Sequence, residues 1–162
     1  MPLADVGGPA AKRQDVSWRR ESEAMNETAT LRSVQDGTTV TFRDAARSRY
    51  EPGVGKFVVH VRGPAIEASA TVDGYMSEGL PRLFREMGRS WTGWKGAKEW
   101  QSLEGELQLS AETDSLGHVT LRVSLRSGHY AYGWRIEIGL LLEAGQLEDT
   151  AHAIESWYAQ YR

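Results

Sequence analysis

Apolar residues occupy every second position over most of this chain, and this period constrains the fold more than any other feature. Successive side chains of a β-strand point to opposite faces, so each such stretch predicts a strand with one apolar and one polar face. The pattern occurs at about 31–34, 39–42, 57–61, 66–72, 103–111, 119–125 and 134–142. Turn sequences such as Asp36-Gly37 and Asp73-Gly74 separate neighbouring stretches. Short connections of this kind favour antiparallel pairing.

The period changes twice to the spacing of an α-helix. One side of a helix predicted near 78–90 carries Leu80, Leu83, Phe84, Met87 and Trp91. The apolar side of a second helix, after Gly145, carries Leu147, Ala151, Ile154, Trp157 or Tyr158, and Tyr161. The predicted order is four strands, a helix, three strands and a helix. We expect an α+β fold in which a curved antiparallel sheet of about seven strands carries two amphipathic helices on its apolar face.

Residues 1–28 lack this patterning. They contain Gly7, Gly8, Pro9 and scattered charges, and they hold almost no branched apolar residues. Such a segment cannot bury enough surface to offset the entropy of ordering. We therefore predict a disordered extension over 1–28 and a single α+β domain over 29–162. Because the patterned sequence begins just after Met25, a further hypothesis takes Met25 as the true start.

The composition excludes several classes of site. The 162 residues include no cysteine, which excludes disulfides, thiolate zinc sites and thiol catalysis. No stretch approaches the roughly 18 apolar residues of a membrane span, and the first residues lack the apolar core of a secretory signal. We expect a cytoplasmic protein with no cofactor and no membrane contact. The net charge of -3 disfavours nucleic acid as a partner, unless a local basic patch provides the contact.

The connection after the first helix is unusually rich in tryptophan. Trp91, Trp94 and Trp100 fall within ten residues, with Gly93 and Gly96 between them. Exposed indoles beside glycines suit a protein-binding hot spot, whereas buried indoles would close the end of a sheet. We expect the burial role for Trp91 and Trp100, and we take Trp94 as the candidate contact.

Positive charge is concentrated beside this connection. The cations between residues 82 and 98 are Arg82, Arg85, Arg89, Lys95 and Lys98. Glu86 is the one acidic residue in that stretch, and the three arginines lie opposite the apolar side of the helix. Such a surface suits an acidic protein partner, a phosphate group or RNA. The simpler interpretation is a solvated helix face whose charges pair with nearby glutamates.

A different interpretation places a ligand pocket between the sheet and the helices. Its candidate residues are Glu99, Trp100, Glu104, His118 and Trp134. Glu104 and Glu106 are expected on one polar strand face, where paired carboxylates could act as acid and base in hydrolysis. Arg122 and Arg126 are expected to neutralise them, and a hydrogen bond in its turn would explain His118. No nucleophile, phosphate-loop or metal-ligand spacing accompanies these residues, so none is assigned a catalytic or metal-binding role.

Four phrases resemble a known family when they are taken together. They are Ser90–Gly96 (SWTGWKG), Trp100–Glu104 (WQSLE), Gly117–Val123 (GHVTLRV) and Leu142–Glu148 (LEAGQLE). From about residue 30 to the C-terminus the chain resembles a family of small uncharacterised proteins from actinomycete bacteria. The resemblance implies a bacterial domain of unknown function and brings no catalytic residues with it. The layout is also similar to that of small immunity proteins of bacterial toxin systems, which is an analogy of layout alone.

The favoured interpretation is therefore a non-enzymatic protein-binding module, in its most specific form one that neutralises a partner toxin. The alternative is a small-molecule binder or hydrolase that uses the pocket between the sheet and the helices. The sequence leaves the identity of the partner and the oligomeric state open.

Overall fold

The computed structural model describes residues 28–128 and 130–161. The elements in chain order are β1 (Ala29–Arg32), β2 (Thr39–Arg47), β3 (Val54–Gly63), β4 (Ile66–Asp73), α2 (Gly79–Arg89), β5 (Lys98–Gln101), β6 (Leu107–Thr113), β7 (Val119–Arg126), β8 (Arg135–Leu142) and α3 (Ala144–Ala159). The predicted disordered extension over 1–28 lies outside the described residues apart from Thr28, and so does the hypothesis about Met25.

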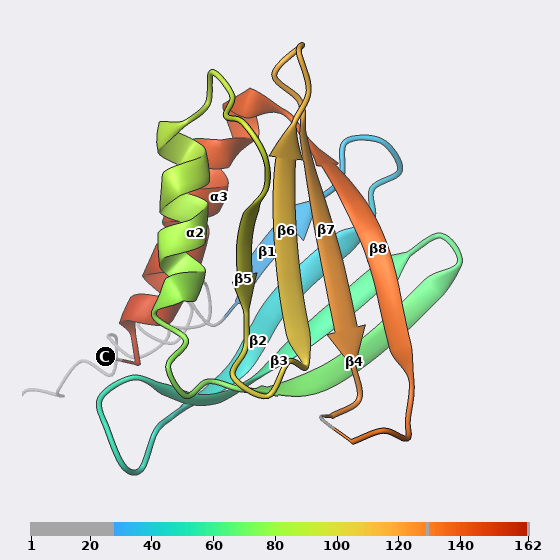
Figure 1. The fold of residues 1–162 in the computed structure, drawn as a ribbon. Coiled ribbons are helices and arrows are strands. Elements are labelled where there is room, and N and C mark those ends of the chain that lie inside the picture. The colour runs from blue at the N-terminus through green and yellow to red at the C-terminus, as the bar shows by residue number, and fades with distance from the viewer. Residues whose placement is uncertain (1–27, 129, 162) are drawn as a thin grey trace, which may run out of the picture.

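The strands form two sheets, which corrects the prediction of one curved sheet. Each sheet has four antiparallel strands, in the orders β1-β2-β3-β4 and β5-β6-β7-β8. Figure 1 shows the second sheet in front, the first sheet crossing behind it, and the two helices side by side along the β5 edge. The sheets are hydrogen-bonded at one corner, where the Val34 N–H donates to the Leu141 carbonyl (2.9 Å) and the Leu141 N–H donates to Ser33 Oγ (3.2 Å). These two hydrogen bonds do not extend into a pair of strands, so the two sheets remain separate.

The sequence pattern predicted about seven strands, and the strand that it missed is β5. It has only four residues, none of them fully buried, so its apolar alternation is weak. The predicted strand start at 103 is wrong, because Leu103 and Glu104 lie in the turn that joins β5 to β6. Gly105 adopts a φ of 71° in this turn, a conformation that favours glycine, and the Ser102 N–H donates to the Leu107 carbonyl to close the hairpin (2.9 Å).

A single hydrophobic core joins both sheets and both helices. The Trp157 ring lies at its aromatic centre, with centroid distances of 5.6 Å to Phe42 and 5.5 Å to Phe57. Leu107 and Val123 are fully buried, and Ile138 packs against the margin of the core. These residues confirm the apolar faces predicted for the strands.

Both helices were predicted correctly. The buried residues of α2 are Leu80, Pro81, Leu83, Phe84 and Met87. Those of α3 are Leu147, Ala151, Ile154, Trp157 and Tyr158. The α3 helix begins slightly earlier than expected, because the Glu143 N–H donates to the Gln146 side chain (2.8 Å) in a capping box. In the described part of the chain, neither helix has the length and hydropathy needed to cross a bilayer.

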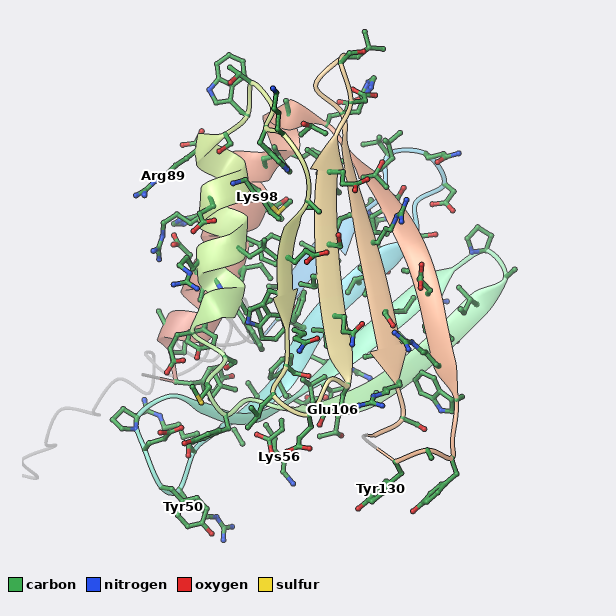
Figure 2. All side chains as sticks on the ribbon, viewed as in Figure 1. Tyr50, Lys56, Arg89, Lys98, Glu106 and Tyr130 are labelled. Carbon is green, nitrogen blue, oxygen red and sulfur yellow. The ribbon has the colours of Figure 1, made fainter. Side chains whose placement is uncertain are left out.

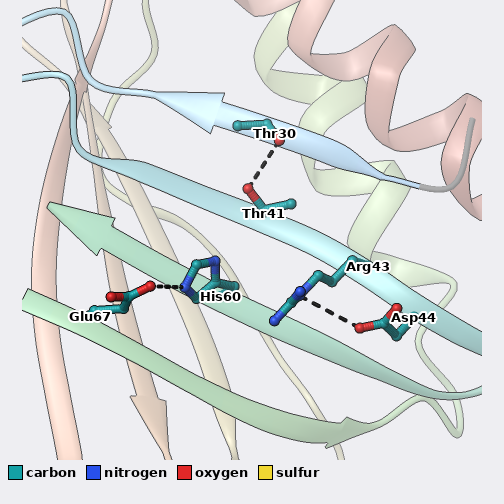
Figure 3. A network of polar contacts seen from close by, with 6 residues as sticks. All are labelled: Thr30, Thr41, Arg43, Asp44, His60 and Glu67. Carbon is teal, nitrogen blue, oxygen red and sulfur yellow. Dashed lines mark hydrogen bonds and ion pairs between the residues drawn. The ribbon is translucent and has the colours of Figure 1, made fainter. Parts of the chain in front are cut away.

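The outer face of the first sheet is polar, as the alternation predicted. Figure 3 shows side-chain pairs on this face. Thr30–Thr41 and His60–Glu67 each join neighbouring strands, and Arg43–Asp44 lies within β2. Thr30 and Thr41 are hydrogen-bonded at 3.0 Å, and His60 Nε2 lies 3.1 Å from Glu67 Oε1. These contacts account for His60 as part of an ordinary solvated sheet face.

Candidate functional site

Trp94 fixes the connection between α2 and β5 to strand β6. Its indole Nε1 donates to the Ala111 carbonyl (3.2 Å), and its backbone N–H donates to Thr113 Oγ1 (3.1 Å). The Thr113 hydroxyl in turn donates to the Trp94 carbonyl (3.0 Å). The Trp94 ring packs against the core, and the Lys98 ammonium lies 5.4 Å from the ring centroid. The residue expected to be the contact thus serves as the fixed point of the loop.

Trp91 is the exposed indole of this connection, at 62% exposure. The expected burial of Trp91 is therefore wrong. The helix ends at Arg89, so the helical spacing that would have placed Trp91 over the core no longer applies two residues later. The Gly93 N–H donates to the Ser90 carbonyl (2.8 Å), which turns the chain immediately after the helix. Trp100 follows expectation, since it is partly buried and packs against the core.

The five predicted cations divide into a paired and an unpaired group. Arg85 of α2 forms an ion pair with Glu155 of α3. Arg82 and Lys98 each lie 4.0 Å from a carboxylate oxygen of Glu86. These pairs fit the simpler interpretation of a solvated helix face for Arg82 and Arg85, and Lys98 of β5 reaches the same helix through Glu86.

Arg89 and Lys95 make up the unpaired group. Both side chains are exposed, and neither forms an ion pair or hydrogen bond with any residue that the structure describes. Arg89 projects from the end of α2 away from the body of the protein (Figure 2). Two free cations therefore flank Trp91 in the sequence, one on each side.

A groove of about 570 Å³ lies between α2 and α3 beside Trp91. Its α2 side consists of Arg85, Gly88, Arg89 and Trp91, and its α3 side of Glu148, Asp149, Ala151, His152 and Glu155. Gly88 of α2 lies against Ala151 of α3 where the helices pack, since a Cβ on Gly88 would be in ordinary van der Waals contact with that of Ala151 at 3.5 Å. Positive charge thus lines one wall and negative charge the other. We call Arg89, Trp91, Lys95 and this groove the Trp91 surface.

The residues of the alternative pocket are not brought together. Glu99 and Trp100 line a hollow of about 700 Å³ on the outer face of the second sheet. Glu104 is exposed in the β5–β6 turn, and Trp134 is 39% exposed before β8. His118 Nδ1 lies 2.9 Å from Asp114 Oδ2 in the β6–β7 turn, which confirms its predicted turn contact. Between the sheets and the helices, core side chains occupy the space where the pocket was expected.

Glu106 lies directly before β6, at the end of the β5–β6 turn. It was expected on the polar face with Glu104, but it is 6% exposed. Ser102 Oγ donates to Glu106 Oε2 (2.7 Å), and the Asp73 N–H donates to Oε1 (3.4 Å). Glu106 therefore ties the β5–β6 turn to the end of β4. With one carboxylate buried and the other exposed, the two do not form the acid–base pair that the alternative interpretation would need.

The two arginines of β7 have different surroundings. Arg126 donates to the backbone carbonyls of Glu104 and Gly105. Arg122 lines the hollow on the outer face of the second sheet. Across residues 28–128 and 130–161, no three His, Asp or Glu side chains gather into a group that could hold a metal ion.

A family model, that of the family of unknown function DUF6228, matches residues 31–161. The chain belongs to this family. The DUF6228 match includes the second half of β1, strands β2 to β8, both helices and the whole Trp91 surface, and it confirms the expectation of a domain of unknown function from about residue 30. No curated protein and no solved structure matches this DUF6228 protein.

Proposed function

We propose that this DUF6228 protein is a non-enzymatic, cytoplasmic protein-binding module that contacts its partner through the Trp91 surface. The observation that carries the proposal is the 62% exposure of Trp91 on a loop that Trp94 fixes to β6. Tryptophan and arginine are the residue types that most often dominate the energy of protein interfaces. A loop that is already ordered also loses little conformational entropy when it binds.

The charges of this surface specify the chemistry of the partner. Arg89 and Lys95 favour acidic side chains next to Trp91, whereas Glu148 and Asp149 on the opposite wall favour basic ones. We therefore expect the partner protein to present an apolar side chain to Trp91, with acidic side chains on one side of it and basic side chains on the other. A toxin that is neutralised by occlusion is the specific version of this proposal, and it rests on the immunity-like layout alone.

The alternative function, a small-molecule binder or hydrolase at Glu99, Glu104 and His118, has less support. Its residues lie at separate places on the second sheet, and His118 is engaged with Asp114. A general acid and base must reach one substrate together, and these side chains do not share a cavity.

The test has two steps. First, the tagged protein is recovered from its native host, and mass spectrometry identifies what binds to it. Second, the dissociation constant of the purified partner is measured for wild type, Trp91→Ala and the control Tyr132→Ala, which truncates an aromatic that is 78% exposed elsewhere. Loss of a hot-spot residue costs about 2 kcal/mol or more, so Trp91→Ala should weaken binding by roughly 30-fold while the control has no effect. Equal affinities for Trp91→Ala and wild type would refute the proposed surface.

Arg89→Glu tests the electrostatic contribution to binding in the same experiment. Reversing a free charge at the rim should slow association and change its salt dependence. Arg85→Glu is unsuitable for this purpose, because it would also break the ion pair with Glu155 that links the two helices.

A further inference from the structure

A second pocket lies on the first sheet, at a different place from the Trp91 surface. It has a volume of about 500 Å³ and is formed by the β2–β3 loop, the start of β3 and the end of β4 with the residues that follow it. Its charged and aromatic side chains are Arg47, Arg49, Tyr50, Lys56, Asp73 and Tyr75. Figure 2 shows Tyr50 and Lys56 along the lower edge of the molecule and Arg89 near the upper end of α2.

Close backbone contacts build the walls of this pocket. The Ser48 N–H donates to the Gly53 carbonyl (2.9 Å), which folds the β2–β3 loop back on itself. A Cβ on Gly55 would lie 2.9 Å from Ser48 Cα, and a Cβ on Gly74 would lie 2.5 Å from the Val54 carbonyl oxygen. Glycine at both positions thus allows the loop and the end of β4 to close around the start of β3.

The pocket carries an excess of positive charge. Arg47, Arg49 and Lys56 line it together with one acidic residue, Asp73, whose Oδ1 accepts a hydrogen bond from the Tyr75 N–H (2.9 Å). Arg47 is held in place by donating to the Gln160 carbonyl (2.9 Å). Arg49 and Lys56 have no ion pair or side-chain hydrogen bond to the rest of the described chain. An anionic group would therefore find two uncommitted cations here.

Two tyrosines add flat apolar faces to this charge. Tyr50 is 97% exposed and Tyr75 is 46% exposed, so both rings are available to stack on a planar group. The backbone is irregular on both sides of the pocket. Among the described residues, the non-glycine positions with positive φ are Asp44 (51°), at the bulge of β2 before the loop, and Met76 (54°), directly after Tyr75. Such unfavourable conformations cluster at ligand sites.

We infer that this pocket binds a small anionic molecule whose negative group is attached to a flat ring. The anion lies between Arg49 and Lys56, and the ring stacks on Tyr50 or Tyr75. This site is independent of the proposed protein contact at Trp91, since the two share no residue.

Calorimetric titration of the full chain tests the inference. The probes are adenosine 5′-monophosphate and phenyl phosphate, which combine a ring and an anion, and adenosine and inorganic phosphate, which supply one part each. At least one combined probe should bind, and roughly tenfold more tightly than either partial probe. The inference is overturned if neither combined probe binds, or if inorganic phosphate binds as tightly as both of them.

Variants then locate the site. Lys56→Gln and Arg49→Gln should each weaken binding of the combined probe by roughly tenfold, because each removes one charge-assisted contact. Arg62→Gln is the matched control, since Arg62 is an exposed cation on the same face of β3 but outside the pocket. Thermal unfolding confirms that each variant is folded. Equal effects of Lys56→Gln and Arg62→Gln would show that binding reflects general surface charge and would overturn the inference.

Discussion

The hydroxyl of Thr113 is hydrogen-bonded to both backbone groups of Trp94, accepting from the N–H at 3.1 Å and donating to the carbonyl at 3.0 Å. The loop that presents Trp91 is therefore positioned by a residue at the end of β6. A loop held in this way is already ordered in the free protein, so it would lose little conformational entropy in the proposed contact. The stability of the domain and the geometry of the Trp91 surface are linked through this one side chain.

Replacing Thr113 with valine preserves its shape and removes both hydrogen bonds. We expect Thr113→Val to lower the free energy of unfolding by about 1–2 kcal/mol, because the partly buried Trp94 groups lose their partner. Thr120→Val is the control, since Thr120 is exposed on β7 of the same hairpin and should change stability by less than about 0.5 kcal/mol. Urea denaturation measures both. Indistinguishable stabilities for the two variants would contradict the positioning role of Thr113.

The buried carboxylate of Glu106 stabilises the β5–β6 turn through its hydrogen bonds with Ser102 and Asp73. Glu106→Ala should cost about 1–3 kcal/mol, since it leaves a buried hydroxyl and N–H without their acceptor. Glu112→Ala removes an exposed carboxylate from β6, the strand that follows this turn, and should be nearly neutral. Guanidinium denaturation of both variants gives the comparison. If Glu106→Ala proved as stable as Glu112→Ala, the side chain could not be holding the turn.

Two glycine substitutions should differ in sign. Gly55→Ala places a methyl group 2.9 Å from Ser48 Cα and should destabilise the protein by about 1–3 kcal/mol, because backbone must move. Gly145→Ala meets no atom within 4 Å near the start of α3 and should be neutral or stabilising by up to about 1 kcal/mol. Thermal melting of both proteins tests the pair. A Gly55→Ala protein that melts at the wild-type temperature would argue against the close packing of the β2–β3 loop.

Asp114 predicts a specific dependence of stability on pH. The hydrogen bond from His118, followed by backbone N–H groups, lowers the pKa of Asp114 below its ordinary value of 3.8. The native state thus favours the ionised carboxylate, so this stabilisation is complete above about pH 3.8 and is lost as the pH falls through the lower native pKa. Asp114→Asn should therefore be less stable than wild type at neutral pH, with a difference that shrinks in acid.

Urea titrations of Asp114→Asn and wild type at several pH values would follow this difference. Glu112→Gln serves as the control for removing a carboxylate from the same hairpin without touching the turn. A difference between Asp114→Asn and wild type that stays constant into strong acid would contradict the assignment.

The elements of the fold were largely predictable, because periodicity is a property of neighbouring residues. The apolar faces of β6, β7 and α3 followed directly from spacing. The division into two sheets did not, since it depends on whether β1 and β8, far apart in the sequence, pair along their length. The β5 strand was missed because its four residues alternate only between half-buried and exposed.

The candidate site was predictable as a region but not residue by residue. The sequence drew attention to the stretch from Arg82 to Lys98, and the free cations and the exposed indole do lie there. The roles of Trp91 and Trp94 were exchanged, because the helix ends at Arg89 and because Thr113, which fixes Trp94, belongs to a different element. Arg85 of α2 pairs with Glu155 of α3, and these two helices are distant in the sequence. Helical spacing within α2 therefore cannot predict this ion pair.

Trp94 fixes the loop to β6 and leaves the Trp91 indole exposed. Fluorine NMR of protein labelled with 5-fluorotryptophan measures the exposure of both indoles, with each resonance assigned by a single Trp→Phe substitution. On transfer from H₂O to D₂O, the Trp91 resonance should show a solvent-induced shift close to that of the free amino acid, and the Trp94 resonance should show a much smaller one. A larger shift for Trp94 than for Trp91 would contradict the account.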